Sequence, residues 1–224
     1  SDLYALESQQ RTEAAIAAGY FDAEIVPVEV TDRKGNVTLV TRDEHPRAGV
    51  TLESLRKLEP VFEVEGHQGI ITAGSASGIT DGGAALVLAS ASHAKLLGCR
   101  PFARIAGWAS AGVDPKIMGI GPVPAMQKLF GRLQQSVDDY DLVELNEAFA
   151  AQVLAVLRDM PIARDRLNVN GGAIALGHPI GCTGARIVVT LLHELQRRNA
   201  TRGLATLCVS GGMGMAMSVE RDQT

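Results

Sequence analysis

Apolar residues recur at helical spacing in the most regular stretch of the chain, residues 183–198. The apolar positions are Ile187, Val188, Leu191, Leu192 and Leu195. This spacing puts them on one face of a helix. Thr183 can cap the first turn, and Arg197 and Arg198 suit the partial negative charge at the last turn. We therefore expect a helix here that packs on a core through its apolar face.

Weaker helical patterns and short apolar runs alternate along the rest of the chain. Helices are expected at residues 3–18, 51–58, 90–97, 122–133 and 147–157. Strands are expected at residues 102–110, 141–145, 204–208 and 215–220, with a hairpin at 24–30 and 37–40. The run at residues 84–89 is typical of a buried strand. This alternation of strands and helices indicates layered α/β architecture.

Composition divides the chain and limits its function. Residues 41–66 are polar, and residues 1–66 are expected to form a peripheral, solvent-rich unit, whereas Gly, Ala and Ser dominate from residue 69. The net charge is −4 and no basic block exists, which argues against nucleic-acid binding. No apolar run reaches the roughly 18 residues of a membrane helix. The odd, widely separated set of Cys99, Cys182 and Cys208 argues for a reducing compartment, and no ligand spacing indicates a metal.

A histidine lies in a glycine-rich loop that opens the helix at 183–198. His178 stands between Gly177 and Pro179. Glycines let a ligand approach the backbone, and a helix N-terminus favours an anion or a thiolate. A loop histidine alone is more often structural or merely exposed. The glycine setting makes His178 a candidate catalytic residue.

Two further segments place polar side chains where strands end. Cys208 ends an apolar run and precedes a glycine turn, and Asn146 stands between a strand and a helix. Open α/β sheets place their sites at such strand ends. Cys208 has two interpretations. It acts as an acid/base or as a nucleophile, or it is simply a small cysteine buried in the core. The amide of Asn146 has a functional interpretation, in which it holds a water or a carbonyl oxygen, and a structural one, in which it caps the helix. Spacing alone favours the cap.

Together these segments resemble three signature blocks of the thiolase family, in order and at fitting distances. The blocks are Asn146-Glu147-Ala148-Phe149, Gly177-His178-Pro179 and Cys208-x-Ser210-Gly211-Gly212-Met213-Gly214. Upstream, residues 72–82 resemble the coenzyme A-contacting turn of thiolases, and residues 47–52 a segment of their loop domain. Two positions depart from the family pattern. Cys182 stands where a small residue is common, and Ser210 stands where glycine is common.

The resemblance implies an α/β, thiolase-like layered αβαβα fold, of which this chain would hold the second half plus part of the loop domain. Residues 1–68 would belong to the loop domain, residues 69–98 to the end of the N-terminal half, and residues 99–224 to the C-terminal half. None of the three cysteines sits in the motif of the thiolase nucleophile. The nucleophilic cysteine would therefore belong to a missing N-terminal half. The resemblance also implies that the protein forms a homodimer or a homotetramer.

The resemblance also implies a role for each candidate. His178 would accept the proton of the nucleophile and help to form an oxyanion hole, which Asn146 would complete by holding a water. Cys208 would move a proton to and from the α-carbon of a thioester. Backbone N–H groups at Ser210 and Gly211 would stabilise the tetrahedral intermediate.

Five residues would bind coenzyme A. They are Ser77 on the pantetheine arm, Arg47 at the adenine-phosphate end with help from Ser54, and Met118 and Phe149 along the pantetheine tunnel. From the residues alone, Arg47 could equally be a solvated surface charge and Met118 ordinary core.

The function implied is that of a cytoplasmic acyltransferase. It would condense two acetyl-CoA molecules to acetoacetyl-CoA or cleave a 3-ketoacyl-CoA, with acyl-CoA and CoA as substrates and no permanently bound cofactor. The alternative is a non-catalytic CoA-binding half that needs a partner chain. Cys208 in its glycine turn argues against a 3-ketoacyl-carrier-protein synthase.

Overall fold

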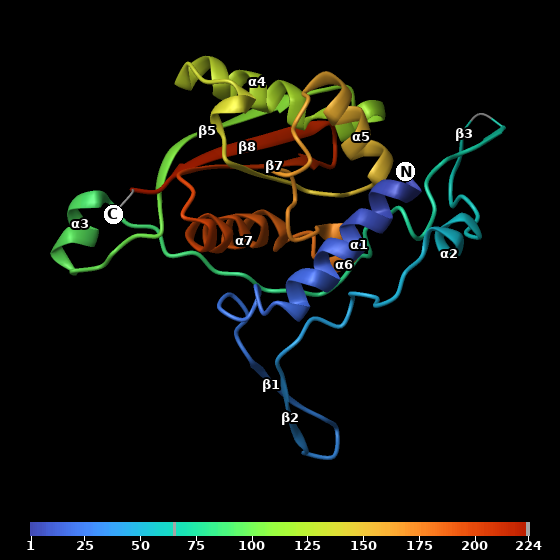
Figure 1. The fold of residues 1–224 in the computed structure, drawn as a ribbon, viewed down its shortest axis with the longest axis horizontal. Helices are drawn as coiled ribbons and strands as arrows, with labels where there is room; N and C mark the ends of the chain where they lie inside the picture. Colours follow the sequence, from blue (N-terminus) through green and yellow to red (C-terminus); the bar gives the residue numbers. More distant parts are fainter. Residues whose placement is uncertain (65, 223–224) are drawn as a thin grey trace.

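A computed structural model of the chain describes residues 1–64 and 66–222. Its centre is a four-stranded sheet, in the order β5-β8-β7-β6 (Figure 1). The strands are β5 (Arg104–Gly112), β6 (Leu142–Leu145), β7 (Arg202–Val209) and β8 (Met213–Glu220). β6 and β7 run parallel, whereas β8 runs antiparallel to both of its neighbours. The four expected strands are thus confirmed, with their ends shifted by a few residues.

Helices cover both faces of the sheet and make a layered α/β fold, as expected. Helix α4 (Pro122–Leu133) lies on one face and helix α7 (Thr183–Arg198) on the other (Figure 1). Helix α5 (Ala150–Asp159) packs beside α4, and the short helix α6 (Ala173–Leu176) precedes α7. Each face has its own apolar core, and the expected face of α7 fills one of them with Ile187, Val188, Leu191 and Leu195.

The remaining elements surround this centre. They are α1 (Asp2–Ala17), β1 (Val28–Thr31), β2 (Val37–Val40), α2 (Leu52–Arg56), β3 (Glu63–Val64), β4 (His67–Gln68), α3 (Ala91–Leu96), and the 3-10 helices η1 (Pro115–Ile120) and η2 (Val137–Asp139). β1 and β2 form the expected hairpin, which projects from the body of the protein (Figure 1).

Helix α1 corrects the expectation that residues 1–66 are only peripheral. Tyr4 and Ala5 belong to the larger apolar core, and α1 packs against α6. The sequence hides this because half of the buried residues of α1 are polar, namely Ser8, Gln9 and Thr12. These side chains are buried through hydrogen bonds rather than through apolar contact.

The buried strand expected at residues 84–89 is wrong. The segment has no regular secondary structure and pairs with no strand in the described parts of the chain, and its side chains are exposed, Val87 to 98%. The apolar run has the composition of a strand. A strand also needs a neighbour for its backbone N–H and C=O groups, and the described residues do not supply one.

Helix α7 runs antiparallel to β7, which fixes where its N-terminal loop lies. Near the end of α7, Leu195 packs on Gly203 at the start of β7. In its first turn, Arg186 brings its guanidinium to within 3.8 Å of the Glu144 carboxyl near the end of β6. The loop before α7 therefore lies at the edge of the sheet where β6 and β7 end.

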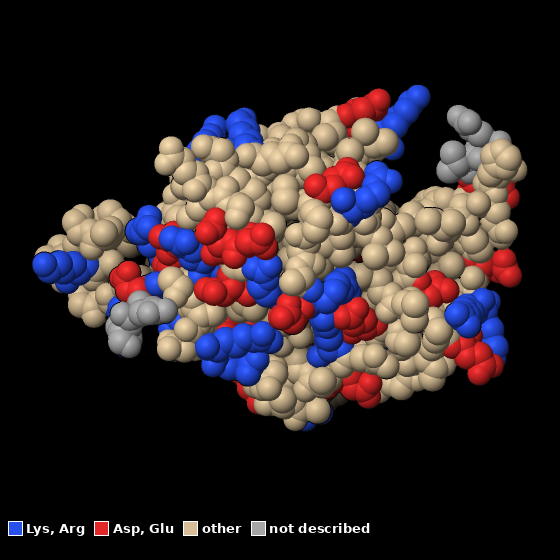
Figure 2. All heavy atoms as spheres, turned by 45° about the horizontal axis from the view of Figure 1, so that its top comes forward, with Lys and Arg blue, Asp and Glu red and all other residues tan. Residues whose placement is uncertain are grey.

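The surface carries mixed charge. Figure 2 shows Lys and Arg side chains interspersed with Asp and Glu on the face in view, without a block of one sign. Among the described residues, no helix is both long and apolar enough to cross a bilayer.

Candidate active site

Asn146 and Cys208 lie at neighbouring strand ends. The N–H of Asn146 donates to the carbonyl of Thr206 (2.9 Å), which extends the pairing of β6 with β7 by one residue. Cys208 follows two residues later, near the end of β7. The structure thus brings two candidates to the sheet edge at which α7 begins.

Asn146 does not cap a helix, although spacing favoured that interpretation. α5 begins at Ala150, and Phe149 occupies the N-cap position. The Asn146 side chain is buried, and neither amide atom has a hydrogen-bond partner in the described residues. A buried amide without partners is rare because it costs free energy. This arrangement favours a functional role over a capping one.

His178 is held by its backbone and by one ring nitrogen. Its N–H donates to the carbonyl of Gly78 (2.8 Å), and Nδ1 lies 2.7 Å from the Thr183 hydroxyl. That hydroxyl donates its only proton to the carbonyl of Pro179 (3.0 Å), so it accepts a hydrogen bond from Nδ1–H. The neutral ring therefore carries its proton on Nδ1 and keeps a lone pair on Nε2.

Partial burial, with a smaller contribution from the Arg186 charge, lowers the pKa of His178 below its usual value. The ring is thus neutral at pH 7 and able to accept a proton. Thr183 does not cap α7 as expected, because Cys182 is the N-cap and makes no side-chain bond. The Thr183 hydroxyl reaches back to the loop instead.

The cysteines near the site are protonated thiols. Burial raises the pKa of Cys208, and partial burial raises that of Cys182. Neither forms a disulfide. After Cys208 the chain turns through Gly211 and Gly212, both in the left-handed region (φ +84° and +85°), and Ser210 and Gly211 are exposed there.

Residues 75–78 join the Asn146 segment to the His178 loop. The N–H and the hydroxyl of Ser77 donate to the carbonyl of Ala148 (both 3.1 Å), and Gly78 accepts from the N–H of His178. The candidate Ser77 therefore lies between two of the three signature segments. The half-buried side chains of Met118 and Phe149 line one shared hollow.

Arg47 and Ser54 stay apart from this cluster. Both are exposed, and no contact joins either to His178, Asn146 or Cys208 in the described part of the chain. The Ser54 hydroxyl takes part in a capping box with Thr51 at the start of α2. Their expected contacts with coenzyme A remain predictions.

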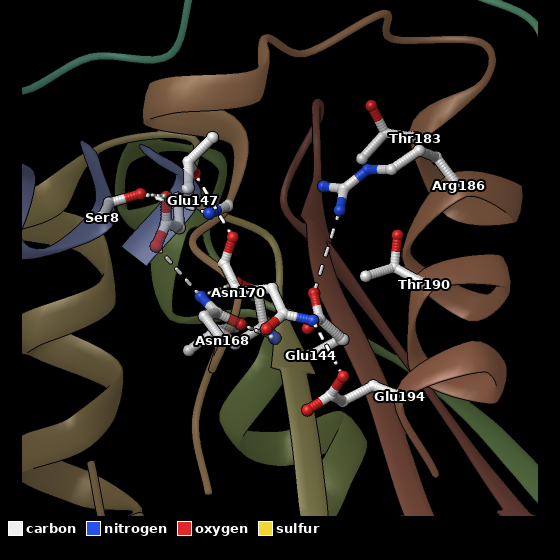
Figure 3. Close-up of polar contacts among 12 residues, drawn as sticks. Ser8, Glu144, Glu147, Asn168, Asn170, Thr183, Arg186, Thr190 and Glu194 are labelled. Atoms are coloured by element: carbon white, nitrogen blue, oxygen red, sulfur yellow. Dashed lines mark hydrogen bonds and ion pairs between the residues drawn. The ribbon is translucent and has the colours of Figure 1, made fainter. Parts of the chain in front are cut away.

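Glu147 is a buried centre of hydrogen bonds that the sequence did not single out. Its carboxylate accepts from Tyr4 Oη (2.8 Å), Ser8 Oγ (2.7 Å), Asn168 Nδ2 (3.1 Å) and the N–H of Ile174 (3.1 Å). Figure 3 shows it between Ser8 on α1 and Asn168. Glu147 thus fixes α1 and the start of α6 to the segment that carries Asn146.

A second buried polar group lies between the sheet and α7. Arg186 Nη1 lies 3.8 Å from Glu144 Oε2, and Asn170 Nδ2 donates to Glu194 (3.0 Å) (Figure 3). Burial raises the pKa of Glu144 to about 8, against the opposing charge of Arg186. Among the described residues, no group of three or more His, Cys, Asp or Glu side chains is arranged to hold a metal ion.

The raised pKa of Glu144 predicts a pH dependence of stability. Between the unfolded pKa of 4.5 and about 8, the folded protein binds a proton that the unfolded chain has lost, so stability falls as pH rises. We expect Glu144→Gln to remove this contribution and to gain roughly 1–3 kcal/mol over the wild type between pH 5 and pH 8. Urea unfolding at pH 5, 6.5 and 8 measures the difference in unfolding free energy between the two proteins. Glu13→Gln, at an exposed position, is the control. A difference between wild type and Glu144→Gln that does not vary with pH would contradict it.

Comparison with known proteins gives two family matches and many relatives. Residues 99–221 match the model described as "Thiolase, C-terminal domain", and residues 1–92 match "Thiolase, N-terminal domain". A β-ketoadipyl-CoA thiolase of Pseudomonas aeruginosa is 55% identical over 98% of this chain and 54% of its own length. An acetyl-CoA acetyltransferase of Allochromatium vinosum is 54% identical over 98% of this chain and 55% of its own. The chain spans about half the length of these curated relatives.

Solved structures give the same picture. The acetyl-CoA acetyltransferase of Bacillus anthracis has a TM-score of 0.93 and 51% identity, over 98% of this chain and 55% of its own. The human mitochondrial 3-ketoacyl-CoA thiolase in complex with CoA has a TM-score of 0.88 and 44% identity. The match covers 99% of this chain and 54% of that structure's chain. At this identity, the likeness covers sequence as well as fold.

Proposed function

Because the chain belongs to the thiolase family, we propose that the protein containing it is an acyltransferase that acts on coenzyme A thioesters. It cleaves a 3-ketoacyl-CoA with CoA, or runs the reverse Claisen condensation of two acetyl-CoA molecules. The observation that carries the proposal is the state of His178, whose Nδ1 donates to Thr183 and whose Nε2 keeps a lone pair. A neutral imidazole held in this way suits a general base.

The nucleophile in this proposal is a cysteine outside these 224 residues. Burial disfavours the thiolate forms of Cys182 and Cys208, and Cys99 is exposed beyond α3. The nucleophilic thiol gives its proton to Nε2 of His178, and its sulfur bonds to the 3-keto carbon of the substrate. The C2–C3 bond then breaks, and its electron pair passes to the enolate of acetyl-CoA.

Cys208 completes this half of the reaction. Its raised pKa keeps the thiol protonated at neutral pH, and it gives that proton to C2 of the enolate. In the condensation direction, the resulting thiolate takes the proton back. The α-proton of a thioester is a very weak acid, so this transfer requires stabilisation of the enolate oxygen. Preorganised donors supply about 2.7–4 kcal/mol each in a comparable oxyanion hole.

Asn146 and His178 are proposed to provide that stabilisation. The unpartnered amide of Asn146 holds a water against the oxygen, and the protonated Nε2 of His178 donates to it directly. The turn at Ser210 and Gly211 offers exposed backbone N–H groups for the tetrahedral intermediate. Ser77, Met118 and Phe149 bind the pantetheine arm, while Arg47 and Ser54 bind the outer end of coenzyme A.

The test is CoA-dependent cleavage of acetoacetyl-CoA by the purified intact protein. Cleavage, with transfer of one acetyl group to a cysteine detected by intact mass, supports the proposal. No cleavage by well-folded intact protein contradicts it. Tight CoA binding without turnover, in a protein without a nucleophile in its sequence, would support the alternative of a CoA-binding half that needs a partner chain.

Thr183 is expected to position His178. Thr183→Val keeps the shape of the side chain but removes the acceptor for Nδ1–H, so the proton is free to move to Nε2, where it blocks the base. One neutral hydrogen bond contributes roughly 0.5–1.5 kcal/mol, so we expect kcat/KM to fall about tenfold. Thr183→Ser, which keeps the hydroxyl, is the control. An unchanged rate and pH profile in Thr183→Val would disprove this role.

A further inference from the structure

A second polar side chain in the candidate site has no partner. Gln152, in the first turn of α5, is 7% exposed, and neither Oε1 nor Nε2 has a hydrogen-bond partner in the described residues. This is the same condition as that of Asn146. Leaving a buried amide without partners costs free energy, because its hydrogen bonds to water are lost and not replaced. Such a group therefore calls for a ligand that completes its bonds.

Gln152 lines the hollow that holds Met118 and Phe149. The hollow measures about 290 Å³ and lies between η1 and α5. Gly119 packs closely on Gln152, because a Cβ at position 119 would lie 2.8 Å from Gln152 Cγ. The other lining residues are Lys116, Ile117, Ile120 and Ala155. The space suits a narrow chain, since it lies at the lower end of the volumes that hold whole small ligands.

The chemistry of the glutamine side chain selects the ligand. Its amide offers two donor hydrogens on Nε2 and an acceptor at Oε1. A thioester, a carboxylate or a phosphate offers acceptors alone and would leave Oε1 unpaired. A secondary amide offers one N–H and one C=O, so it satisfies both ends of Gln152. The pantetheine arm carries two such amides on an apolar chain.

We propose that Gln152 binds a secondary amide of the pantetheine arm of coenzyme A in the hollow beside Met118 and Phe149. This inference rests on the proposed function. It adds a binding residue that acts on the carrier part of the substrate and not on the reacting carbons. Gln152 then lowers KM without changing the chemical steps, as uniform binding does.

The test compares Gln152→Met with wild type on three substrates that differ in their amides. They are acetoacetyl-CoA, the acetoacetyl thioester of N-acetylcysteamine with one amide, and that of butanethiol with none. We expect KM for acetoacetyl-CoA to rise about tenfold, with kcat unchanged and no change for the butanethiol ester. An effect on the N-acetylcysteamine ester assigns the amide nearer to sulfur, and its absence assigns the farther one. A rise of KM for all three substrates, or for none, overturns the proposal.

Thermal unfolding separates binding from a merely structural role. Without ligand, Gln152→Met removes an unpaired buried amide, so its Tm should equal or exceed that of the wild type. The rise in Tm on adding CoA should shrink. Gln196→Met, on the exposed side of α7, is the matched control. A lower Tm without ligand and an undiminished CoA response overturn the proposal. If wild type binds CoA but cleaves no acetoacetyl-CoA, the proposed function fails while this measurement still decides the role of Gln152.

Discussion

Replacing His178 by asparagine is expected to lower kcat/KM for acetoacetyl-CoA cleavage by about 10²–10⁴-fold, the usual contribution of a general base. The substitution keeps the backbone N–H that donates to Gly78 but removes Nε2, the atom left free by the contact with Thr183. No other group in the described loop takes over, since Cys182 is held as a thiol by its raised pKa.

The pH profile gives a second readout for His178. In the wild type, kcat/KM should fall as pH drops through the lowered pKa of His178, below 6.5, because the ring then carries a proton on both nitrogens. His178→Asn should lose that acidic limb. The control is His193→Asn on α7, another partly buried histidine with a lowered pKa, whose ring lies 5.1 Å from that of Phe102 in a tilted arrangement. A His178→Asn rate within threefold of the wild type would refute the assignment.

Glu147→Ala is expected to have the largest effect on stability. It leaves Tyr4 Oη, Ser8 Oγ, Asn168 Nδ2 and the N–H of Ile174 without their shared acceptor, all in buried surroundings. Each unpaired buried donor costs roughly 1–3 kcal/mol, and partial rearrangement reduces the sum. We expect a loss on the order of 3–5 kcal/mol in the free energy of unfolding.

Urea unfolding of Glu147→Ala measures this loss as a lower midpoint at an unchanged slope. Glu53→Ala on α2 is the matched control, because Glu53 pairs with Lys57 on the surface, where such a pair contributes only about 0.3–0.5 kcal/mol. Equal midpoints for the two variants would show that the Glu147 contacts do not stabilise the fold.

Local patterns predicted much of this fold because they depend on near neighbours along the chain. The spacing of apolar residues predicts the buried face of α7. Short apolar runs predict β6 and β7, whose ends carry Asn146 and Cys208. Residues 84–89 show the limit of this reasoning. Their composition is that of a strand, but strand formation depends on a partner that lies elsewhere.

The polar contacts of the site were harder to predict for the same reason. Glu147 bonds to Tyr4 and Ser8, which precede it by 143 and 139 residues, and no local pattern links such positions. Thr183 looked like a helix cap, and only the structure shows its hydroxyl between Pro179 and His178. The sequence does carry one signal for this network. Glu144 and Glu147 are carboxyl side chains within a mostly apolar segment, where a carboxyl needs buried hydrogen-bond partners.

The place of β8 in the sheet sets the order in which the protein can fold. β5 pairs with β8 alone in the described sheet, and the register joins Arg104 to Glu220. β8 also joins β5 to β7, yet it is synthesised after both. On the ribosome, β5 must wait unpaired while more than a hundred residues follow it. Contacts of such long range slow folding and expose strand edges meanwhile. Completion of this sheet must therefore wait until β8 has been synthesised.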